Sequence, residues 1–289
     1  MRPGGLGKAV AYRLGVIARY AESAPGLAAI PQWLALGAIR ARLTGGEACL
    51  PRAADGRARE FDIRVGAHPG HKVRLDLSSL AEFDGFEEIY VRRIYRLAGI
   101  PFRPRVVLDC GANVGYFASL CRMAFADARI FCWEPEPGNF ARLTGQPLLQ
   151  SELVSLSPDA VSDAEGHLPF AGGGLGGRVT GAGEAAGMQV GAVDLRARML
   201  PLRDEPTLVK IDIEGHEERL IPSLAGAWPR VCALFLETHQ EPGKDAVLLK
   251  LLSDDGFRCQ LQGTHGLPGE KRIFNEYFAV RDPQAAAHG

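Results

Sequence analysis

The chain has 289 residues, of which 46% are hydrophobic and 23% are charged, and its formal net charge at pH 7 is -1. These values are typical of a globular protein and argue against long disordered regions, collagen-like repeats and a membrane channel. A net charge near zero provides no basic field for unspecific binding of nucleic acid, so we expect no nucleic-acid partner.

The first part of the chain, residues 1–60, is expected to form an N-terminal helical extension. Within residues 7–43 the apolar positions recur at mixed spacings of three and four, which predicts two helices. These helices would cap the rest of the protein, or would rest with a basic face on a membrane or a partner, and a homodimer through them is a further alternative. The most apolar stretch, residues 24–39, contains Pro25 and Pro31 and is shorter than the roughly 20 residues of a spanning helix, so we expect no membrane span.

The six cysteines indicate a reducing compartment. They are scattered singly and form no C-x-x-C pair that would hold zinc or act as a redox couple, so we interpret them as small hydrophobic residues. The N-terminus also lacks a compact apolar segment ending in a small-residue cleavage site. We therefore expect a cytoplasmic protein.

Residues 61–104 are expected to form a small hairpin and a helix that lead into the main domain. Apolar and polar residues alternate from residue 62 to residue 77, with a turn at residues 68–71, which predicts two paired strands. A helix is expected around residues 87–97.

Residues 105–282 are expected to form the catalytic domain, followed by a tail at residues 283–289. Short apolar runs alternate here with helical patterns, which is typical of a parallel sheet flanked by helices. Residues 172–187 are dense in glycine and lack an apolar period, which predicts a mobile surface loop. The expected strands are residues 106–108, 129–133, 153–156, 208–213, 231–237, 258–261 and 277–280, and the expected helices are residues 116–125, 216–224 and 244–254.

The strongest local signal is a glycine-bearing turn between the first of these strands and the first helix. Residues 106–117 read VVLDCGANVGYF. Gly111 and Gly115 remove side chains where the backbone must approach a ligand, and the helix N-terminus presents unpaired N–H groups to a carboxylate. Only two glycines occur, and no Gly-Lys-Ser/Thr follows, so the pattern disfavours binding of a pyrophosphate.

The next strand ends in Glu134. In this topology an acidic side chain at that place accepts hydrogen bonds from both hydroxyls of a ribose. The alternative is a solvated charge or a helix cap.

Three sequence blocks together resemble the FkbM family of methyltransferases. The blocks are LDCGANVGYF at 108–117, WEPEPGNF at 133–140 and LVKIDIEGHE at 208–217. The resemblance covers about residues 85–282 and not the N-terminal third. It implies a class I methyltransferase fold, an α/β architecture with a seven-stranded, mostly parallel sheet, helices on both faces and an antiparallel last strand. It also implies S-adenosylmethionine as the methyl donor and O-methylation of sugars, polyketides or related metabolites.

Position by position, the resemblance implies contacts to the donor. Glu134 would bind the ribose, and Asp163 would meet the adenine amino group unless it simply belongs to a turn before the hairpin expected at residues 167–170. The residues implied around the amino-acid portion of the donor are Asp109, Gly111, Asn113 and Gly115.

The reacting centre is expected at the carboxyl edge of the sheet, where open parallel sheets bind their ligands. Asp212, Glu214 and His216 follow one strand there, and Glu237 and His239 follow the next. We expect His216 or His239 to act as general base, with Asp212 or Glu237 orienting it or holding the acceptor hydroxyl. Each histidine has a structural alternative, as a solvated helix-start residue or a buried structural residue. A divalent metal in this cluster is an alternative that we do not favour, since no spacing is diagnostic.

Taken together, the sequence predicts an S-adenosylmethionine-dependent O-methyltransferase that acts on a hydroxyl of a sugar, glycan or secondary metabolite. Two other functions stay open at this point. One is a catalytically silent binding module with the same fold, and the other is a nicotinamide-dependent oxidoreductase, against which the missing third glycine counts.

Overall fold

The computed structural model describes residues 59–63, 71–76, 82, 85–172, 177–180, 187–240, 245–265 and 273–281. The chain divides into a small unit, residues 1–94 with 145–148, and a large unit, residues 95–144 with 149–289. The two N-terminal helices expected within residues 7–43 and the tail at 283–289 lie outside the described residues.

The small unit contains the expected hairpin. Strands β1 (Arg59–Ile63) and β2 (His71–Leu75) pair antiparallel, and Val73 and Leu75 of β2 are fully buried. The Gln146 side chain accepts a hydrogen bond from the backbone N–H of Arg74 and donates one to its carbonyl oxygen, which joins residues 145–148 to this hairpin.

The helix expected around residues 87–97 is interrupted. A π-helical turn, η2 (Glu87–Arg92), ends at Arg93 in the left-handed region with φ 55°, and a 3₁₀ turn, η3 (Leu97–Gly99), follows. The left-handed residue stops the helical hydrogen-bond pattern, so the single expected helix is replaced by two short turns.

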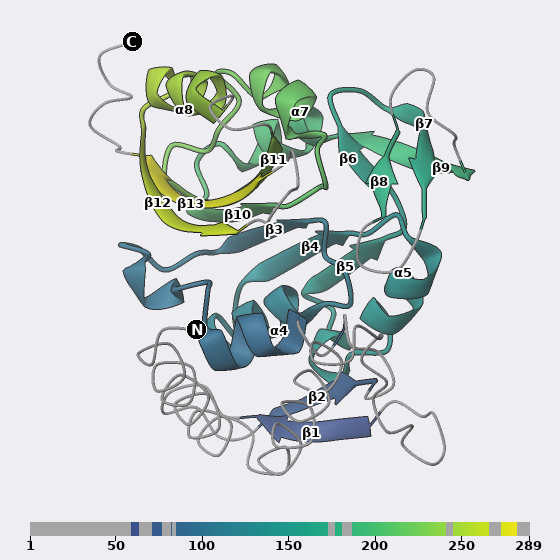
Figure 1. The fold of residues 1–289 in the computed structure, drawn as a ribbon. Helices are drawn as coiled ribbons and strands as arrows, with labels where there is room; N and C mark the ends of the chain where they lie inside the picture. Colours follow the sequence, from purple (N-terminus) through teal and green to yellow (C-terminus); the bar gives the residue numbers. More distant parts are fainter. Residues whose placement is uncertain are drawn as a thin grey trace, which may run out of the picture. The chain divides into compact units, whose positions relative to one another are not determined.

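The large unit is built on a seven-stranded sheet with the order β12-β13-β11-β10-β3-β4-β5 (Figure 1). The neighbours from β11 to β5 are parallel, whereas β13 is antiparallel to both β11 and β12. The strands are β3 (Val106–Cys110), β4 (Arg129–Trp133), β5 (Val154–Ser157), β10 (Thr207–Ile211), β11 (Cys232–Gln240), β12 (Phe257–His265) and β13 (Ile273–Arg281). This order and the antiparallel β13 confirm the expected class I methyltransferase architecture.

Helices cover both faces of this sheet. Helix α4 (Tyr116–Ala124) lies on one face, and α7 (Glu217–Ser223) and α8 (Asp245–Asp254) lie on the other (Figure 1). Because β3 and β10 are covered on both faces, all ten of their residues are buried and they are apolar at most positions. The remaining helical segments are α5 (Pro137–Leu143), η4 (Pro147–Leu149), α6 (Leu195–Met199) and η6 (Leu200–Leu202).

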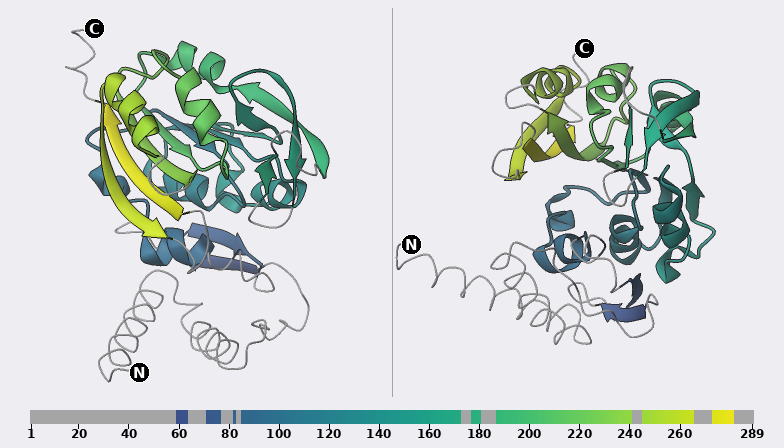
Figure 2. Two further views of the ribbon diagram at one scale, coloured as in Figure 1. Left: turned by 45° about the horizontal axis from the view of Figure 1, so that its top comes forward. Right: turned by 45° about the vertical axis from the view of Figure 1, so that its right-hand side comes forward.

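A second, four-stranded sheet with the order β6-β9-β7-β8 was not expected. It contains β6 (Ala160–Ser162), β7 (Gly166–Ala171), β8 (Arg178–Val179) and β9 (Met188–Asp194), and β6 contacts α7 (Figure 2). The expectation of a loop throughout residues 172–187 is therefore wrong at β8, which pairs with β7. The physical reason is the long-range pairing of β7 with β8 and β9, which a short apolar pattern does not reveal.

No helix among the described residues has both the length and the apolar character needed to cross a bilayer.

Candidate active site

The glycine turn between β3 and α4 brings two strand ends together. Gly111 has φ +80°, and a Cβ atom at this position would lie 1.8 Å from the carbonyl oxygen of Asp212. Only glycine therefore allows the end of β3 to approach the residue that follows β10. Gly115 has φ +87° and is the N-cap of α4, so its left-handed backbone begins that helix.

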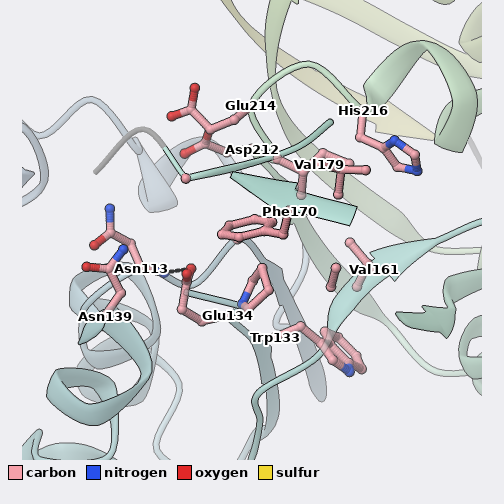
Figure 3. A pocket seen from close by; sticks show the side chains of 15 residues that line it. Asn113, Trp133, Glu134, Asn139, Val161, Phe170, Val179, Asp212, Glu214 and His216 are labelled. Carbon is pink, nitrogen blue, oxygen red and sulfur yellow. Dashed lines mark hydrogen bonds between the residues drawn. The ribbon is translucent and has the colours of Figure 1, made fainter. Parts of the chain in front are cut away.

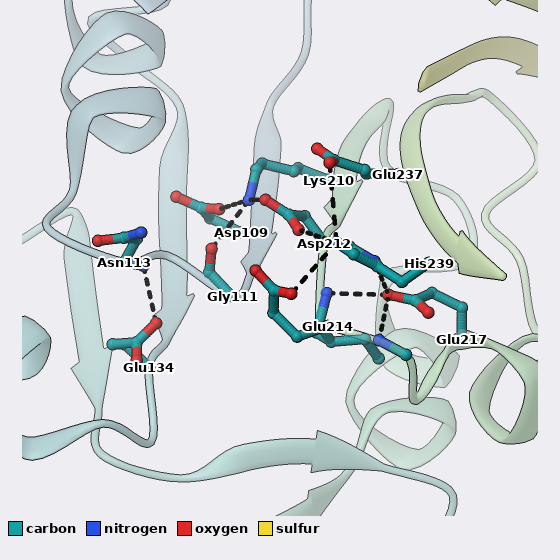
Figure 4. Close-up of polar contacts among 12 residues, drawn as sticks. Asp109, Gly111, Asn113, Glu134, Lys210, Asp212, Glu214, Glu217, Glu237 and His239 are labelled. Atoms are coloured by element: carbon teal, nitrogen blue, oxygen red, sulfur yellow. Dashed lines mark hydrogen bonds and ion pairs between the residues drawn. The ribbon is translucent and has the colours of Figure 1, made fainter. Parts of the chain in front are cut away.

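Glu134 holds this turn from the end of β4. One of its carboxylate oxygens accepts the backbone N–H of Asn113 at 2.8 Å (Figure 4). The other accepts the backbone N–H of Glu136 at 2.9 Å. Glu134 is 6% exposed. Burial raises its pKa, and the two backbone hydrogen bonds oppose that rise only in part.

The turn and Glu134 line a cavity beside the ends of β3, β4 and β10. Phe170 and Val179 of the second sheet contribute to it, opposite Asn113 and Glu134 (Figure 3). The lining residues are Gly111, Asn113, Trp133, Glu134, Pro135, Asn139, Ala160, Val161, Phe170, Gly177, Val179, Asp212, Ile213, Glu214 and His216.

Six of the eleven expected site residues line this cavity and five do not. The six are Gly111, Asn113, Glu134, Asp212, Glu214 and His216, and the five are Asp109, Gly115, Asp163, Glu237 and His239. Two apolar lining residues that sequence reasoning missed, Phe170 and Val179, come from the unexpected second sheet. The hairpin predicted at residues 167–170 was the only signal for them.

Lys210 is a buried cation that sequence reasoning also missed. Its Nζ donates to the carbonyl oxygen of Gly111 at 2.8 Å and lies 3.1 Å from Asp212 Oδ2 and 3.7 Å from Asp109 Oδ1. Burial alone would lower the pKa of Lys210, but the nearby carboxylates, Asp212 first, raise it well above its usual value. Conversely, burial raises the pKa of Asp109 to about 7, although Lys210 opposes this rise. Lys210 therefore stays charged and ties the glycine turn to Asp212.

His239 lies at the centre of a carboxylate cluster. Its Nδ1 is 3.0 Å from Glu217 Oε1, and its Nε2 is 3.4 Å from Glu214 Oε2, 3.7 Å from Glu237 Oε1 and 3.8 Å from Asp212 Oδ1 (Figure 4). Burial lowers the pKa of His239, but the hydrogen bond and charge of Glu217 outweigh it and raise the pKa to about 10. A histidine that holds its proton at neutral pH cannot accept another one, so the geometry disfavours His239 as general base.

Glu217 is the second buried residue of this cluster that the sequence did not reveal. Its side chain is fully buried, and Oε1 also accepts the backbone N–H groups of Ile213 and Gly215, each at 3.2 Å. Glu217 therefore fixes both the loop that carries Glu214 and the ring of His239.

His216 lies beside the second sheet. Its Nε2 is 3.1 Å from Ser162 Oγ on β6, and burial and then the charge of Arg219 lower its pKa, so it is neutral at pH 7. Asp163 accepts hydrogen bonds from Arg219 Nε at 2.8 Å and Ser162 Oγ at 2.9 Å. These bonds outweigh the effect of burial and lower the pKa of Asp163. The structure thus pairs Asp163 with Arg219 and does not bring it to the cavity wall.

No family model matches the chain. Three curated proteins are similar to it, and each is named a methyltransferase. The 31-O-demethyl-FK506 methyltransferase FkbM of Streptomyces tacrolimicus is 26% identical over 208 residues, which are 60% of this chain and 80% of the relative. The hexuronic acid methyltransferase AglP of Haloferax volcanii is 27% identical over 46% of this chain and 56% of the relative. The methyltransferase sdnD of Sordaria araneosa is 30% identical over 29% and 33%.

Solved structures with similar folds have low sequence identity. The precorrin-6y C5,15-methyltransferase of Geobacter metallireducens is 14% identical with a TM-score of 0.40, over 67% of this chain and 88% of that chain. M. jannaschii TYW2 in complex with AdoMet is 13% identical with a TM-score of 0.43, over 78% and 89%. The M. jannaschii tRNA m1G37 methyltransferase is 13% identical with a TM-score of 0.42, over 86% and 67%. The match to FkbM confirms the resemblance that the three sequence blocks indicate.

Proposed function

We propose that this protein transfers a methyl group from S-adenosylmethionine to a hydroxyl oxygen of a sugar, glycan or secondary metabolite. The observation that carries the proposal is that the glycine turn and Glu134 share one cavity with Asp212 and Glu214. The three curated relatives support the class of enzyme, and two of them are named for a hexuronic acid and for 31-O-demethyl-FK506.

The cavity fits the donor at its amino-acid end. Asn113 Oδ1 is buried without a hydrogen-bond partner, and Asn113 lines the cavity, so an ammonium group there would satisfy it. We propose that the turn from Gly111 to Asn113 and the N-terminus of α4 bind the amino-acid portion. Asp109 and Gly115 do not line the cavity. Asp109 is proposed to act indirectly through its ion pair with Lys210, and Gly115 by starting helix α4.

Glu134 is proposed to bind the ribose, since each carboxylate oxygen keeps a second lone pair beside its backbone hydrogen bond. Trp133, Val161 and Phe170 form the apolar part of the wall next to it and suit a purine ring. We leave Asp163 out of the donor contacts because Arg219 and Ser162 already engage it.

The acceptor hydroxyl is proposed to lie against the cluster at the ends of β10 and β11. When bound, the donor supplies an electrophilic methyl group on a sulfonium, so the protein has to align the acceptor oxygen and remove its proton. Lys210 engages Asp212, and His239 is only 3% exposed. Glu214 and Glu237 are 33% and 24% exposed, and burial raises the pKa of Glu214 to about 7 and that of Glu237 to about 9. Glu214 is therefore the proposed proton acceptor, and Glu237 is proposed to hold the acceptor hydroxyl. His216 is the alternative, since it is neutral and lines the cavity.

Donor binding is tested by calorimetric titration with S-adenosylhomocysteine. Glu134→Gln should weaken binding about 10- to 100-fold, because a charged acceptor of two hydroxyl hydrogen bonds is lost. The matched control is Glu218→Gln, an exposed carboxylate on α7 that should leave the affinity unchanged. Equal affinity of the Glu134 variant and the parent would refute the ribose assignment.

Methyl transfer is tested with labelled donor and hexuronic acids, glycans and metabolite fractions, followed by mass spectrometry. Glu214→Gln and Glu237→Gln should each slow transfer by about 100-fold or more while the affinity for S-adenosylhomocysteine stays within roughly threefold. Donor binding without transfer to any fraction would favour the binding module. Label found only in RNA would identify RNA as the acceptor and refute the proposed acceptor class.

A further inference from the structure

The Nε2 atom of His239 is aimed at three carboxylates but is hydrogen-bonded to none of them. The three oxygens lie at 3.4, 3.7 and 3.8 Å, beyond the distances of about 2.7–3.2 Å that are normal for hydrogen bonds of nitrogen. The His239 side chain is 3% exposed, and in the described part of the chain no hydrogen bond of Nε2 is found. The ring nitrogen and the three carboxylate oxygens, which pair with it only at these longer distances, surround a position that suits a cation.

The other side of the ring is fixed as it is in metal-bound histidines. Nδ1 lies 3.0 Å from Glu217 Oε1, and Glu217 is itself held by the N–H groups of Ile213 and Gly215. A histidine that ligates a metal usually donates its second ring N–H to a carboxylate, which fixes the tautomer and aims the free nitrogen. Glu217 therefore directs Nε2 into the carboxylate cluster, where a metal ion would take the place of the proton that Nε2 otherwise carries.

The spacing of the candidate ligands suits one small cation. Asp212, Glu214 and His239 each offer one ligand atom, and all three atoms lie within 4.8 Å of one another. Donor atoms about 2.1 Å from a common ion lie roughly 3.0–3.4 Å apart. The two distances from His239 Nε2, 3.4 and 3.8 Å, require shifts of only a few tenths of an ångström, and the Asp212 and Glu214 oxygens, which lie within 4.8 Å of each other, would have to close onto the ion. Asp212 pairs with Lys210 through Oδ2, which leaves Oδ1 for the ion.

We propose that Asp212, Glu214 and His239 bind one divalent cation that accepts oxygen and imidazole ligands together, such as Mn²⁺. One imidazole and two carboxylates leave open coordination positions. Asp212 and Glu214 also line the cavity, so an ion between them can bind an oxygen of a ligand there. This binding site does not depend on the proposed methyl transfer. If that function holds, Asp212, Glu214 and His239 would hold the ion, which would supply polarisation of an acceptor hydroxyl, and His216 on the cavity wall would be left to take the proton.

The test is a titration of the metal-free full-length protein with Mn²⁺ alone, in which electron paramagnetic resonance measures the free ion. The parent should bind one Mn²⁺ per chain. Glu214→Gln and His239→Gln should each weaken binding at least about tenfold, and Glu217→Gln by about 10- to 100-fold. The exposed Glu218→Gln and His167→Gln are matched controls and should bind as the parent does.

Glu214→Gln is the decisive variant because this side chain is 33% exposed and its replacement leaves the buried Glu217 bonds in place. Circular dichroism and the urea midpoint check that each variant is folded. No Mn²⁺ binding by the parent up to millimolar concentration, or equal binding by the parent and folded Glu214→Gln, would overturn the site. Mn²⁺ binding without methyl transfer to any acceptor would leave the site standing and refute the function. Methyl transfer by a parent protein that binds no Mn²⁺ would refute the metal site and leave the proposed function standing.

Discussion

Gly111 shows how one missing side chain shapes the site. Gly111→Ala places a methyl group against the carbonyl oxygen of Asp212 and also forces alanine into a left-handed conformation at φ +80°. Gly226→Ala is the matched control, since Gly226 has φ +70° and a Cβ atom there would have no neighbour within 4 Å. We expect a loss of about 1 kcal/mol for Gly226→Ala and about 2–4 kcal/mol for Gly111→Ala, measured by urea unfolding. Equal losses would show that the contact with Asp212 is unimportant.

Glu217 is predicted to be the more costly of two adjacent glutamates to replace. Glu217→Ala leaves the N–H groups of Ile213 and Gly215 and the ring of His239 without their acceptor, whereas Glu218 is exposed. We expect Glu217→Ala to lower the free energy of unfolding by about 3 kcal/mol and Glu218→Ala by less than about 0.5 kcal/mol. The urea midpoints of both variants measure this. A Glu217→Ala midpoint close to that of the parent would contradict the assigned hydrogen bonds.

The buried contacts of Lys210 and Glu217 could not be predicted from the sequence. Both residues lie inside the block at 208–217 that carries the resemblance, and Asp212, Glu214 and His216 in the same block, which the sequence singled out as catalytic candidates, line the cavity. The alternation of a strand tells which residues share a face, but it does not tell that a lysine on a buried strand reaches the carbonyl oxygen of Gly111. That contact depends on the neighbouring strand.

At the scale of elements, the second sheet supplies the apolar wall of the cavity. Phe170 lines the cavity and packs with Ala160 and Val190 in a small hydrophobic cluster. Phe170→Ala should weaken binding of S-adenosylhomocysteine by about fivefold or more, because a large apolar contact is removed. Leu168→Ala is the control, since Leu168 packs against the same cluster but does not line the cavity. If both variants lower the affinity equally in calorimetry, Phe170 acts only through the stability of the sheet.

This sheet was not predicted because its pairing is distant along the chain. Strand β6 pairs parallel with β9, where Ala160 lies opposite Ala192, and the segment between them is rich in glycine. The seven main strands were predicted well, because wholly apolar runs bounded by helical patterns indicate a parallel sheet directly. The expected bounds of β4 match, and those of β3, β5 and β10 differ by one or two residues, but β11, β12 and β13 extend several residues beyond the expected bounds. Polar residues such as Gln240 and Asn275 belong to them through pairing alone.

For the whole molecule, ligand binding is expected to stabilise the large unit in particular. S-adenosylhomocysteine at about 100 times its dissociation constant should raise the free energy of unfolding by about 2.7 kcal/mol, since it binds only the folded state. Hydrogen exchange should slow at the ends of β3, β4 and β10, which border the cavity, and should be unchanged in β1 and β2 of the small unit. Glu134→Gln should lose most of both effects at the same ligand concentration. Equal protection of β1 and β2 would contradict a binding site confined to the large unit.

The position of β13 has a consequence for how the protein is made. Strand β13 follows β12 in the chain but lies between β12 and β11, and β11 carries Glu237 and His239. While the ribosome is still synthesising residues 273–281, β11 has an open edge whose N–H and C=O groups lack a neighbour. The β11 side of the carboxylate cluster is therefore not supported by its neighbouring strand until β13 inserts. A product stopped before residue 273 would leave the edge of β11 unpaired and open to aggregation, chaperones and proteases.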